Sequence, residues 1–368
     1  MRIIEIIPSL VSGGAERFVV DLSNELSIDH EVFLVVLYSL DDPIRSFYLR
    51  DVSKRVNIIE LNKHKGFDIR LFFKLYRLIK KLAPDVVHTH MPGIVYIQLS
   101  LFLNRIPLYV HTIHNDAFKE RGRDIINKMS RIRSFKLKRV IPVTISKESN
   151  ESFKRCYGLS APIIFNGRNI PSDICVTDQV LKEFVNYRHS SDTKVIINLA
   201  RVQSQKRQDL LARVAKRLED EGYNFQILII GRIHDEEMKR RIIDANCSKL
   251  LLLGEKDNPL EYLSLADAYT LSSSHEGMPI SLIEALGVGA IPICTPVGGC
   301  KDVIIDGENG LLAKDISEDE YYVMLKRFMS LSPEEIKQMK TGTKRSYANY
   351  SMTECANQYV TLFNRFKK

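Results

Sequence analysis

The stretch from Thr270 to Gly299, TLSSSHEGMPISLIEALGVGAIPICTPVGG, has the pattern of a strand, a polar loop, a short helix, a second strand and a glycine pair. Proline is favoured in the first turn of a helix, where its missing N–H is not needed, and glycine is favoured at the end. We therefore predict a helix from about Pro279 to Leu286, with Gly287 and Gly289 at its end.

The amino end of this helix is a candidate ligand site, because its free N–H groups and the positive end of its dipole favour an anion or a hydroxyl-rich ligand. Glu276 precedes the helix and Glu284 lies about two turns along it, so two carboxylates, which only accept hydrogen bonds, border the site. A sugar nucleotide has the matching phosphates and hydroxyls. In the alternative interpretation, Glu276 is a helix-entry carboxylate and Glu284 is solvated. The candidate backbone contacts are Gly277, Met278, Pro279 and Ile280.

Length and composition favour a two-domain globular protein. The chain has 368 residues, of which 45% are hydrophobic and 27% charged. Its 6 cysteines are scattered without a CxxC pair, which argues against zinc and for a reducing compartment. The first residues, MRIIEIIPSL, lack a signal-peptide core, and no apolar run reaches the ~18 residues of a membrane span. We expect a cytoplasmic protein, either free or peripheral at the inner face of the membrane.

Aliphatic strands alternate with helical patterns twice along the chain, with a polar connection at about 171–192. This alternation indicates α/β domains with parallel sheets covered on both faces. We predict a first domain at 1–175, a second at 190–350 and an amphipathic helix at about 354–368. Predicted elements include a strand at 86–87, a helix at 93–103, a strand near 163–165, and a helix at 69–82 with Ile69, Phe72, Phe73, Tyr76 and Ile79 on one face.

Ligands in such folds bind at the carboxyl ends of the strands. In the first half these predicted ends carry Gly13 and Gly14, His88, His90 and His114, and in the second half they carry Arg201, Gly231 and Gly254.

Arg201 and Lys206 form a pair of cations in one of these loops. They would suit a diphosphate leaving group, whose charge grows as its bond to the sugar breaks. A solvated loop is the alternative. For Gly13 and Gly14 a tight turn is an equally good explanation, since GxGxxG is not matched, and His114 could be a structural histidine.

The glutamates seven residues apart, with Gly277, Ala285 and the Gly298-Gly299 turn, closely resemble the signature of the retaining family-4 glycosyltransferases of GT-B fold. The resemblance extends along nearly the whole chain. It includes GGAER, PDVVHTH, VTISKES, IFNGRN and LARVQSQKRQD. One departure follows Ile230, where the family often has Gly-x-Gly and this chain has Gly231, Arg232 and Ile233.

The resemblance implies two Rossmann-like, doubly wound domains facing across a cleft, an N-terminal one for the acceptor and a C-terminal one for the nucleotide-sugar donor, with the last helix returning to the first domain. It implies retaining, metal-independent transfer of a hexosyl group from a UDP- or GDP-sugar to a glycan or lipid-linked hydroxyl acceptor. Arg201 and Lys206 would hold the diphosphate, Glu284 the ribose, Glu276 the hexose, and His114 would lie near the transferred sugar. The loop at Gly13 and Gly14 would approach the donor phosphate and the acceptor. No cofactor is expected, and the metal-binding signature DxD is absent from the sequence.

Two stretches are strongly basic: 63–81 with seven basic and one acidic residue, and 119–139 with nine and two. Solvated helix faces are the default interpretation. Nucleic acid is disfavoured, because aromatic interleaving is thin and no nucleic-acid module is present. Binding to an anionic membrane surface is a third interpretation of these stretches, since Ile125, Met129, Ile132 and Phe135 can form one apolar stripe among the basic residues.

Surface polysaccharide or glycolipid biosynthesis is the expected role. Two other functions stay open. A sugar-nucleotide epimerase of the same fold would need no acceptor, and a non-catalytic polymer-binding protein would use the basic half alone.

Overall fold

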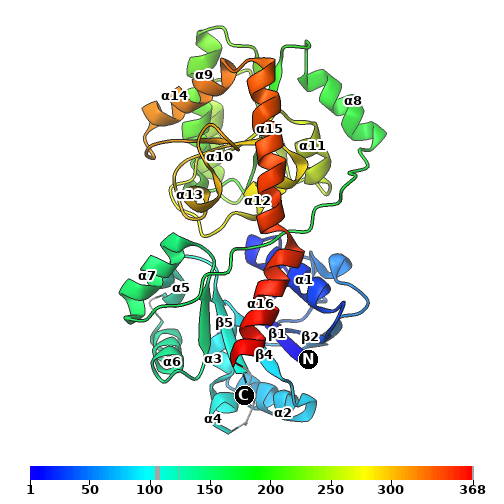
Figure 1. Cartoon of the computed structure of the whole chain (residues 1–368), viewed down its shortest axis with the longest axis vertical. Helices are drawn as coiled ribbons and strands as arrows, with labels where there is room; N and C mark the ends of the chain where they lie inside the picture. Colours follow the sequence, from blue (N-terminus) through cyan, green and yellow to red (C-terminus); the bar gives the residue numbers. More distant parts are fainter. Residues whose placement is uncertain (104–107, 123, 367–368) are drawn as a thin grey trace. The chain divides into compact units, whose positions relative to one another are not determined.

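The N-terminal part of the chain is built on a parallel sheet of 6 strands in the order β3-β2-β1-β4-β5-β6. The computed structural model describes residues 1–103, 108–122 and 124–366. Figure 1 shows this sheet beneath helices α1 and α16. The strands are β1 (Arg2–Ile7), β2 (Glu31–Val36), β3 (Asn57–Glu60), β4 (Val86–His90), β5 (Leu108–Ile113) and β6 (Ile141–Thr144).

Side chains alternate between the two faces of this sheet, as the period of two along a strand requires. On one face Ile4, Ile6 and Val87 belong to a hydrophobic core shared with α2 and its neighbours. On the other face Glu5, His88 and His90 lie beneath α1 and α16, whose Phe18 and Tyr359 contact the histidine rings. The helices are α1 (Gly14–Leu26), α2 (Arg70–Leu82), α3 (Gly93–Tyr96), α4 (Gln98–Leu103), α5 (Ala117–Arg121), α6 (Ile125–Lys136), α7 (Lys147–Tyr157) and α16 (Met352–Phe366), with the short η1 (Leu49–Asp51).

A second parallel sheet of 6 strands, in the order β12-β11-β10-β7-β8-β9, forms the centre of the C-terminal part. Its strands are β7 (Lys194–Leu199), β8 (Phe225–Ile230), β9 (Leu250–Gly254), β10 (Ala268–Leu271), β11 (Ile291–Cys294) and β12 (Leu311–Leu312). Its helices are α8 (Asp178–Tyr187), α9 (Gln208–Asp220), α10 (Glu236–Asp244), α11 (Pro259–Leu265), α12 (Ile280–Val288), α13 (Cys300–Val303), α14 (Glu318–Met329) and α15 (Pro333–Tyr347), with η2 (Ser204–Lys206) and η3 (Ala348–Tyr350).

The chain divides into two compact units, each with one sheet. The first unit comprises Met1–Asn169 and the chain from Tyr350 onward, and the second comprises Ile170–Asn349. Helix α16 packs on α1 in the first unit, although the two are far apart in sequence (Figure 1). The predicted fold class, α/β with two parallel-sheet domains, is confirmed.

Several predicted element boundaries were wrong. Strand β4 extends to His90, so His88 and His90 lie within the strand and not beyond it. The helix expected at 93–103 is two helices, α3 and α4. The strand expected near 163–165 is a single bridge between Thr144 and Ile163. The connection expected at 171–192 contains α8, which belongs to the second unit.

The buried face of α2 also differs from the prediction. Leu71, Leu75 and Ile79 are the buried residues of this helix, whereas Ile69 before it and Phe73 are 63% and 54% exposed. Both sets have helical spacing, and the sheet decides which one is covered. The exposed side of this segment therefore combines apolar residues with lysines and arginines.

The basic stretch 119–139 contains the end of α5 and all of α6, and Arg123 lies outside the described residues. The predicted apolar stripe is divided, because Phe135 belongs to the core and Ile132 packs against it. Ile125 and Met129 are 75% and 57% exposed. None of the helices that the structure describes is both long enough and apolar enough to cross a membrane.

Candidate active site

The carboxyl edge of the second sheet brings two polar loops together, one after β7 and one after β10. The Ser272 hydroxyl donates to the carbonyl oxygens of Lys206 and Arg207, at 2.8 and 3.0 Å. The Gln205 amide donates to the carbonyl of His275 at 2.7 Å. Because β7 and β10 are neighbours in the sheet, these contacts fix the Lys206 loop against the Glu276 loop.

Lys206 and Glu276 form an ion pair across these loops. Their Nζ and Oε1 atoms are 2.6 Å apart, and the two side chains are only 13% and 8% exposed. The Ser273 hydroxyl donates to the same carboxylate oxygen. A charge-assisted contact with little solvent access holds both groups in place and leaves ammonium protons and carboxylate lone pairs for a ligand.

Helix α12 begins beside this pair. Its N-cap is Pro279, whose backbone is extended, and the helix ends at Val288 with Gly289, at φ +82°, as its C-cap. The helix thus begins one residue later and ends two residues later than predicted, with Gly287 inside it. Glu284 lies on α12 and is 8% exposed, so it is a buried residue and not a solvated one.

The Gly298-Gly299 turn closes on the loop before α12. The Gly299 N–H donates to the Gly277 carbonyl at 2.7 Å. Gly298 has φ +52°, and a Cβ there would lie 2.3 Å from the Glu276 carbonyl oxygen. Glycine is therefore required for this close approach. Gly277, Met278 and Ile280 are buried in the loop and in the first turn of α12.

Gly231 and Gly254 meet where β8 and β9 end. The Gly231 N–H donates to the Gly254 carbonyl at 2.8 Å. Gly231 has φ +152°, and a Cβ there would lie 2.1 Å from the Ala200 carbonyl oxygen. This glycine keeps β8 close to the residue that precedes Arg201.

Arg201 is exposed at the end of β7 and lies near a second arginine. Burial lowers the pKa of His234, and the charges of Arg201 and Arg232 lower it further. The Val202 N–H donates to the Arg232 carbonyl at 2.9 Å, which joins the two loops. Arg232, which stands where the family often has Gly-x-Gly, thus adds a cation to this edge.

In the first unit, Gly13 is the N-cap of α1 and Gly14 is its first residue. A Cβ on Gly13 would lie 2.3 Å from a carboxylate oxygen of Glu16, which is buried. The glycine therefore accommodates the Glu16 side chain.

His114 follows β5 and is held at two points. Its Nε2 atom lies 2.9 Å from Nδ1 of His90. Its backbone N–H donates to Oε2 of Glu120 at 2.8 Å. Burial, together with the neighbouring His90 ring, holds the pKa of His114 well below its usual range, so the ring is neutral at pH 7.

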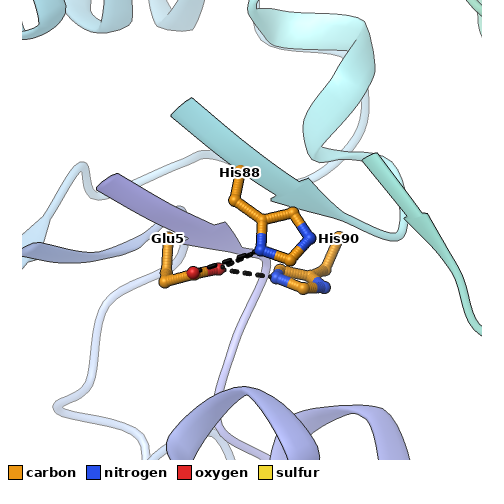
Figure 2. A group of neighbouring side chains, drawn as sticks. All are labelled: Glu5, His88 and His90. Atoms are coloured by element: carbon orange, nitrogen blue, oxygen red, sulfur yellow. Dashed lines mark hydrogen bonds and ion pairs between the residues drawn. The ribbon is translucent and has the colours of Figure 1, made fainter. Parts of the chain in front are cut away.

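His90 also contacts a buried carboxylate, that of Glu5, which Figure 2 shows facing the rings of both His88 and His90. Glu5 accepts from Nε2 of His90 at 2.8 Å and lies 3.1 Å from Nδ1 of His88. Burial raises the pKa of Glu5, but the two rings outweigh it and lower this pKa to about 2. Burial and the His88 ring lower the pKa of His90 to about 4. The carboxylate is charged at pH 7 and His90 is neutral.

Glu120 is itself held by a buried arginine. Arg131 of α6 lies 3.0 Å from Glu120, donates to Nε2 of His111 at 2.7 Å and to the Met91 carbonyl at 2.8 Å. Burial raises the pKa of Glu120, but Arg131 and His111 lower it to about 2. Arg131, expected in a surface stretch, is in fact a buried residue that supports the His114 backbone.

The sequence reasoning missed Glu5, Glu120 and Arg131. Glu5 had a usable signal, since it is the one charged residue within the apolar run IIEII of a buried strand. The spacing of His88 and His90 places both on the face of Glu5, as Figure 2 shows. For Glu120 and Arg131 we find no such signal.

Two family models match the chain in succession. Glycosyltransferase Family 4 matches residues 12–170, and Glycosyl transferases group 1 matches residues 180–345. Together they cover both units apart from the ends and a short connection.

Curated relatives are similar over most of their length. An Escherichia coli UDP-Gal:alpha-D-GlcNAc-diphosphoundecaprenol alpha-1,3-galactosyltransferase is 24% identical over 89% of this chain and 82% of the relative. A Campylobacter jejuni N-acetylgalactosamine-N,N'-diacetylbacillosaminyl-diphospho-undecaprenol 4-alpha-N-acetylgalactosaminyltransferase is 25% identical over 87% of this chain and 88% of the relative.

Solved structures share the fold. The Anabaena HepE protein in complex with UDP superposes with a TM-score of 0.82 at 13% identity, covering 99% of this chain and 100% of that one. A Rickettsia africae glycosyltransferase gives 0.80 at 18% identity, covering 100% and 98%. With both family models and the two parallel sheets in agreement, the chain belongs to the family-4 glycosyltransferases of GT-B fold.

Proposed function

We propose that this glycosyltransferase moves a hexosyl group, with retention, from a nucleotide-diphosphate sugar to a hydroxyl of a lipid-linked or glycan acceptor, in surface polysaccharide or glycolipid biosynthesis. The observation that carries the proposal is the Lys206–Glu276 pair beside the amino end of α12. A cation suited to phosphate and a carboxylate suited to sugar hydroxyls are thus in direct contact, which supports the proposal. The names of the two relatives, one with a UDP-galactose donor and both with diphosphoundecaprenol, support this donor and acceptor class.

Each site residue has a role in this proposal. Lys206 and Arg201 neutralise the diphosphate, where two cations can do the work of a divalent ion, so we propose that neither metal nor cofactor is needed. Glu284 accepts from the ribose and Glu276 from the hexose hydroxyls. The backbone at Gly231, Gly254 and 277–280 approaches the nucleotide. Gly13, Gly14 and His114 keep the roles that the resemblance implies, in a first unit that binds the acceptor while the second binds the donor.

In the reaction, the bond from the anomeric carbon to the diphosphate breaks, and the diphosphate leaves with the electron pair. The acceptor oxygen bonds to that carbon on the same face, and its proton passes to a phosphate oxygen. The cations stabilise this transition state more than the ground state, because the charge on the diphosphate grows as the bond breaks.

Thermal shift with UDP, UDP-glucose, UDP-galactose and GDP-mannose tests donor binding, since a ligand that binds only the native state raises Tm. Lys206→Ala should weaken UDP binding by about 10- to 100-fold, the range for a lost charged hydrogen bond. Glu276→Gln should keep UDP binding and lose the added affinity for the sugar. Lys216→Ala is the matched control, because Lys216 lies on α9 and pairs only locally, with Glu219 and Asp220.

Wild-type binding of UDP-sugars by Lys206→Ala would overturn the site. NMR of the product made on a short-chain diphospholipid sugar tests retention, and a β-linked product from an α-linked donor would contradict it. Isotope exchange at the sugar ring without acceptor would favour the epimerase instead.

The exposed apolar and basic residues of the first unit support contact with an anionic membrane. Ile125 and Met129 on α6, and Ile69 and Phe73 at α2, are more than half exposed among lysines and arginines. Apolar insertion beside positive charge is the pattern of an interfacial anchor. Flotation should recover the protein with phosphatidylglycerol vesicles and not with phosphatidylcholine ones.

Ile125→Ser with Met129→Ser should reduce this recovery. Ile243→Ser is the control, because Ile243 is 58% exposed but lies on α10 of the second unit. Equal recovery with both lipids, or equal loss in the control, would remove the membrane from the proposal.

A further inference from the structure

A chain of direct contacts links the buried Glu5 carboxylate to the ring of His114. Oε2 of Glu5 lies 2.8 Å from Nε2 of His90, and Nδ1 of His90 lies 2.9 Å from Nε2 of His114. Figure 2 shows the first of these contacts. Since a neutral imidazole has one N–H and one lone pair, each contact constrains the next.

The protons can be assigned from the carboxylate outward. A charged carboxylate only accepts, so Nε2 of His90 carries the proton and Nδ1 carries the lone pair. The facing nitrogen must then donate, which places the proton of His114 on Nε2. The remaining nitrogen of His114, Nδ1, has a lone pair and bonds to none of the residues that the structure describes.

A metal ion bound by Glu5, His88 and His90 is the alternative explanation for this cluster. One ligand atom from each of Glu5, His88 and His90 lies within 4.8 Å of the others. Tetrahedral zinc ligands about 2.0–2.1 Å from the metal stand roughly 3.3 Å apart. The contacts of Glu5 Oε2 with His88 Nδ1 and His90 Nε2 are 3.0 and 2.8 Å, so hydrogen bonds fit better.

We propose that Glu5 and His90 are positioning residues that fix His114 as the tautomer protonated on Nε2, so that Nδ1 accepts a hydrogen bond from a hydroxyl of a bound sugar. This rests on the proposed function, since it specifies which atom of His114 accepts from the sugar. Glu120 holds the backbone of the same residue, and Phe18 packs edge-on against the His114 ring at a centroid distance of 5.5 Å.

Nitrogen-15 NMR of the histidine side chains in the full chain tests the tautomer without any activity measurement. The chain has 9 histidines, so His114→Asn serves to assign the signals. We expect the protonated-nitrogen signal of His114 on Nε2 and the lone-pair signal on Nδ1. The opposite pattern in the wild-type protein overturns the proposal.

Glu5→Met tests the cause. A thioether of similar length leaves Nε2 of His90 without a carboxylate to donate to, so the proton on His90 is no longer held there and His114 should become partly or wholly protonated on Nδ1. Thr112→Val is the matched control: it removes the hydroxyl 2.8 Å from Nε2 of His88 and leaves the Glu5–His90–His114 contacts intact. An unchanged His114 tautomer in folded Glu5→Met overturns the proposal.

Two further readouts separate this proposal from the proposed function. Saturating UDP-sugar should shift Nδ1 of His114, and Glu5→Met should lower the transfer rate by about 10- to 100-fold, as for partners that orient metal-bound histidines. The expected tautomer without sugar binding would contradict the function alone. Sugar binding with the opposite tautomer would contradict the positioning alone. A shift of the nitrogen signals of His88 Nδ1 and His90 Nε2 on addition of one equivalent of Zn²⁺ would also contradict the positioning alone.

Discussion

At the residue scale, Gly231 and Gly222 separate two costs of adding a side chain. Both have positive φ, +152° and +82°, but a Cβ on Gly231 would lie 2.1 Å from a backbone oxygen and one on Gly222 meets nothing within 4 Å. Gly222→Ala should cost only backbone strain, about 1 kcal/mol, and Gly231→Ala several times that, with loss of UDP-sugar binding. Thermal denaturation of both variants checks this. Equal losses of Tm would show that the close approach at Ala200 is unimportant.

Single residues also show what the sequence could predict. Lys206 and Glu276 were predicted because they lie in polar loops at strand ends and match the signature of the family, and the structure joins them at 2.6 Å. Their roles in transfer stay predictions. Glu5 and Arg131 were not predicted, because their partners come from other strands and helices, and sequence gives no measure of that proximity.

At the element scale, α6 carries one arginine that is structural and one that is not. Arg131 is 1% exposed and paired with Glu120, whereas Arg133 on the same helix is exposed. Arg131→Met leaves a buried carboxylate uncompensated and should destabilise the first unit by about 3–5 kcal/mol. Arg133→Met should change stability by less than about 0.5 kcal/mol. Denaturation of the two variants measures both changes in stability. Similar losses of stability in the two variants would contradict the assigned role of Arg131.

Strands β4 and β5 should make the first unit acid-sensitive. The pKa of His90 and of His111 is about 4 in the folded protein, whereas the ordinary pKa of a histidine is near 6.5. Below pH 6.5 the unfolded chain therefore binds more protons than the folded protein. This contribution to the free energy of unfolding is fully present above pH 6.5. It is lost as the pH falls toward 4, by at most about 2 kcal/mol per histidine at pH 5. Glu5 and Glu120 add a loss of the same sign only below about 4.5.

Hydrogen exchange, corrected for the intrinsic rate, measures this locally. Amides of β4 and β5 should lose protection between pH 7 and pH 5, while those of β10 and β11, which contain no histidine, should not. A parallel loss in all four strands would assign the acid sensitivity to something other than the buried histidines.

Sequence periodicity predicted most strands but not which face of α2 is buried. The set with Phe73 and the set with Leu75 both recur at helical spacing, and only the packing of Leu71, Leu75 and Ile79 on the sheet distinguishes them. Period and composition define an element well, whereas its orientation depends on neighbours that are distant in sequence.

At the scale of the whole molecule, the first unit is completed by the end of the chain. Tyr359 of α16 contacts Thr112 of β5 through their hydroxyls at 2.7 Å, across 247 residues of sequence. Periodicity predicted an amphipathic helix here, and the resemblance alone suggested where it packs. The amphipathic pattern predicts that one face of this helix is buried, but it does not predict which domain that face packs against.

Removing α16 should therefore damage the unit that is far from it in sequence. A chain ending after Tyr350 loses the buried Tyr359 and Phe363 and uncovers the face that carries His88 and Thr112. Amides of β1, β4 and β5 should exchange faster, while those of β7 and β10, in the second unit, should keep their protection. Tyr359→Phe, which removes only the hydroxyl bond, should cost about 1 kcal/mol and leave the exchange pattern of the whole sheet intact. Because each large apolar side chain lost from a core costs about 3–5 kcal/mol, truncation and point change should differ severalfold. Loss of protection in the second sheet on truncation would mean that the two units do not fold as separate bodies.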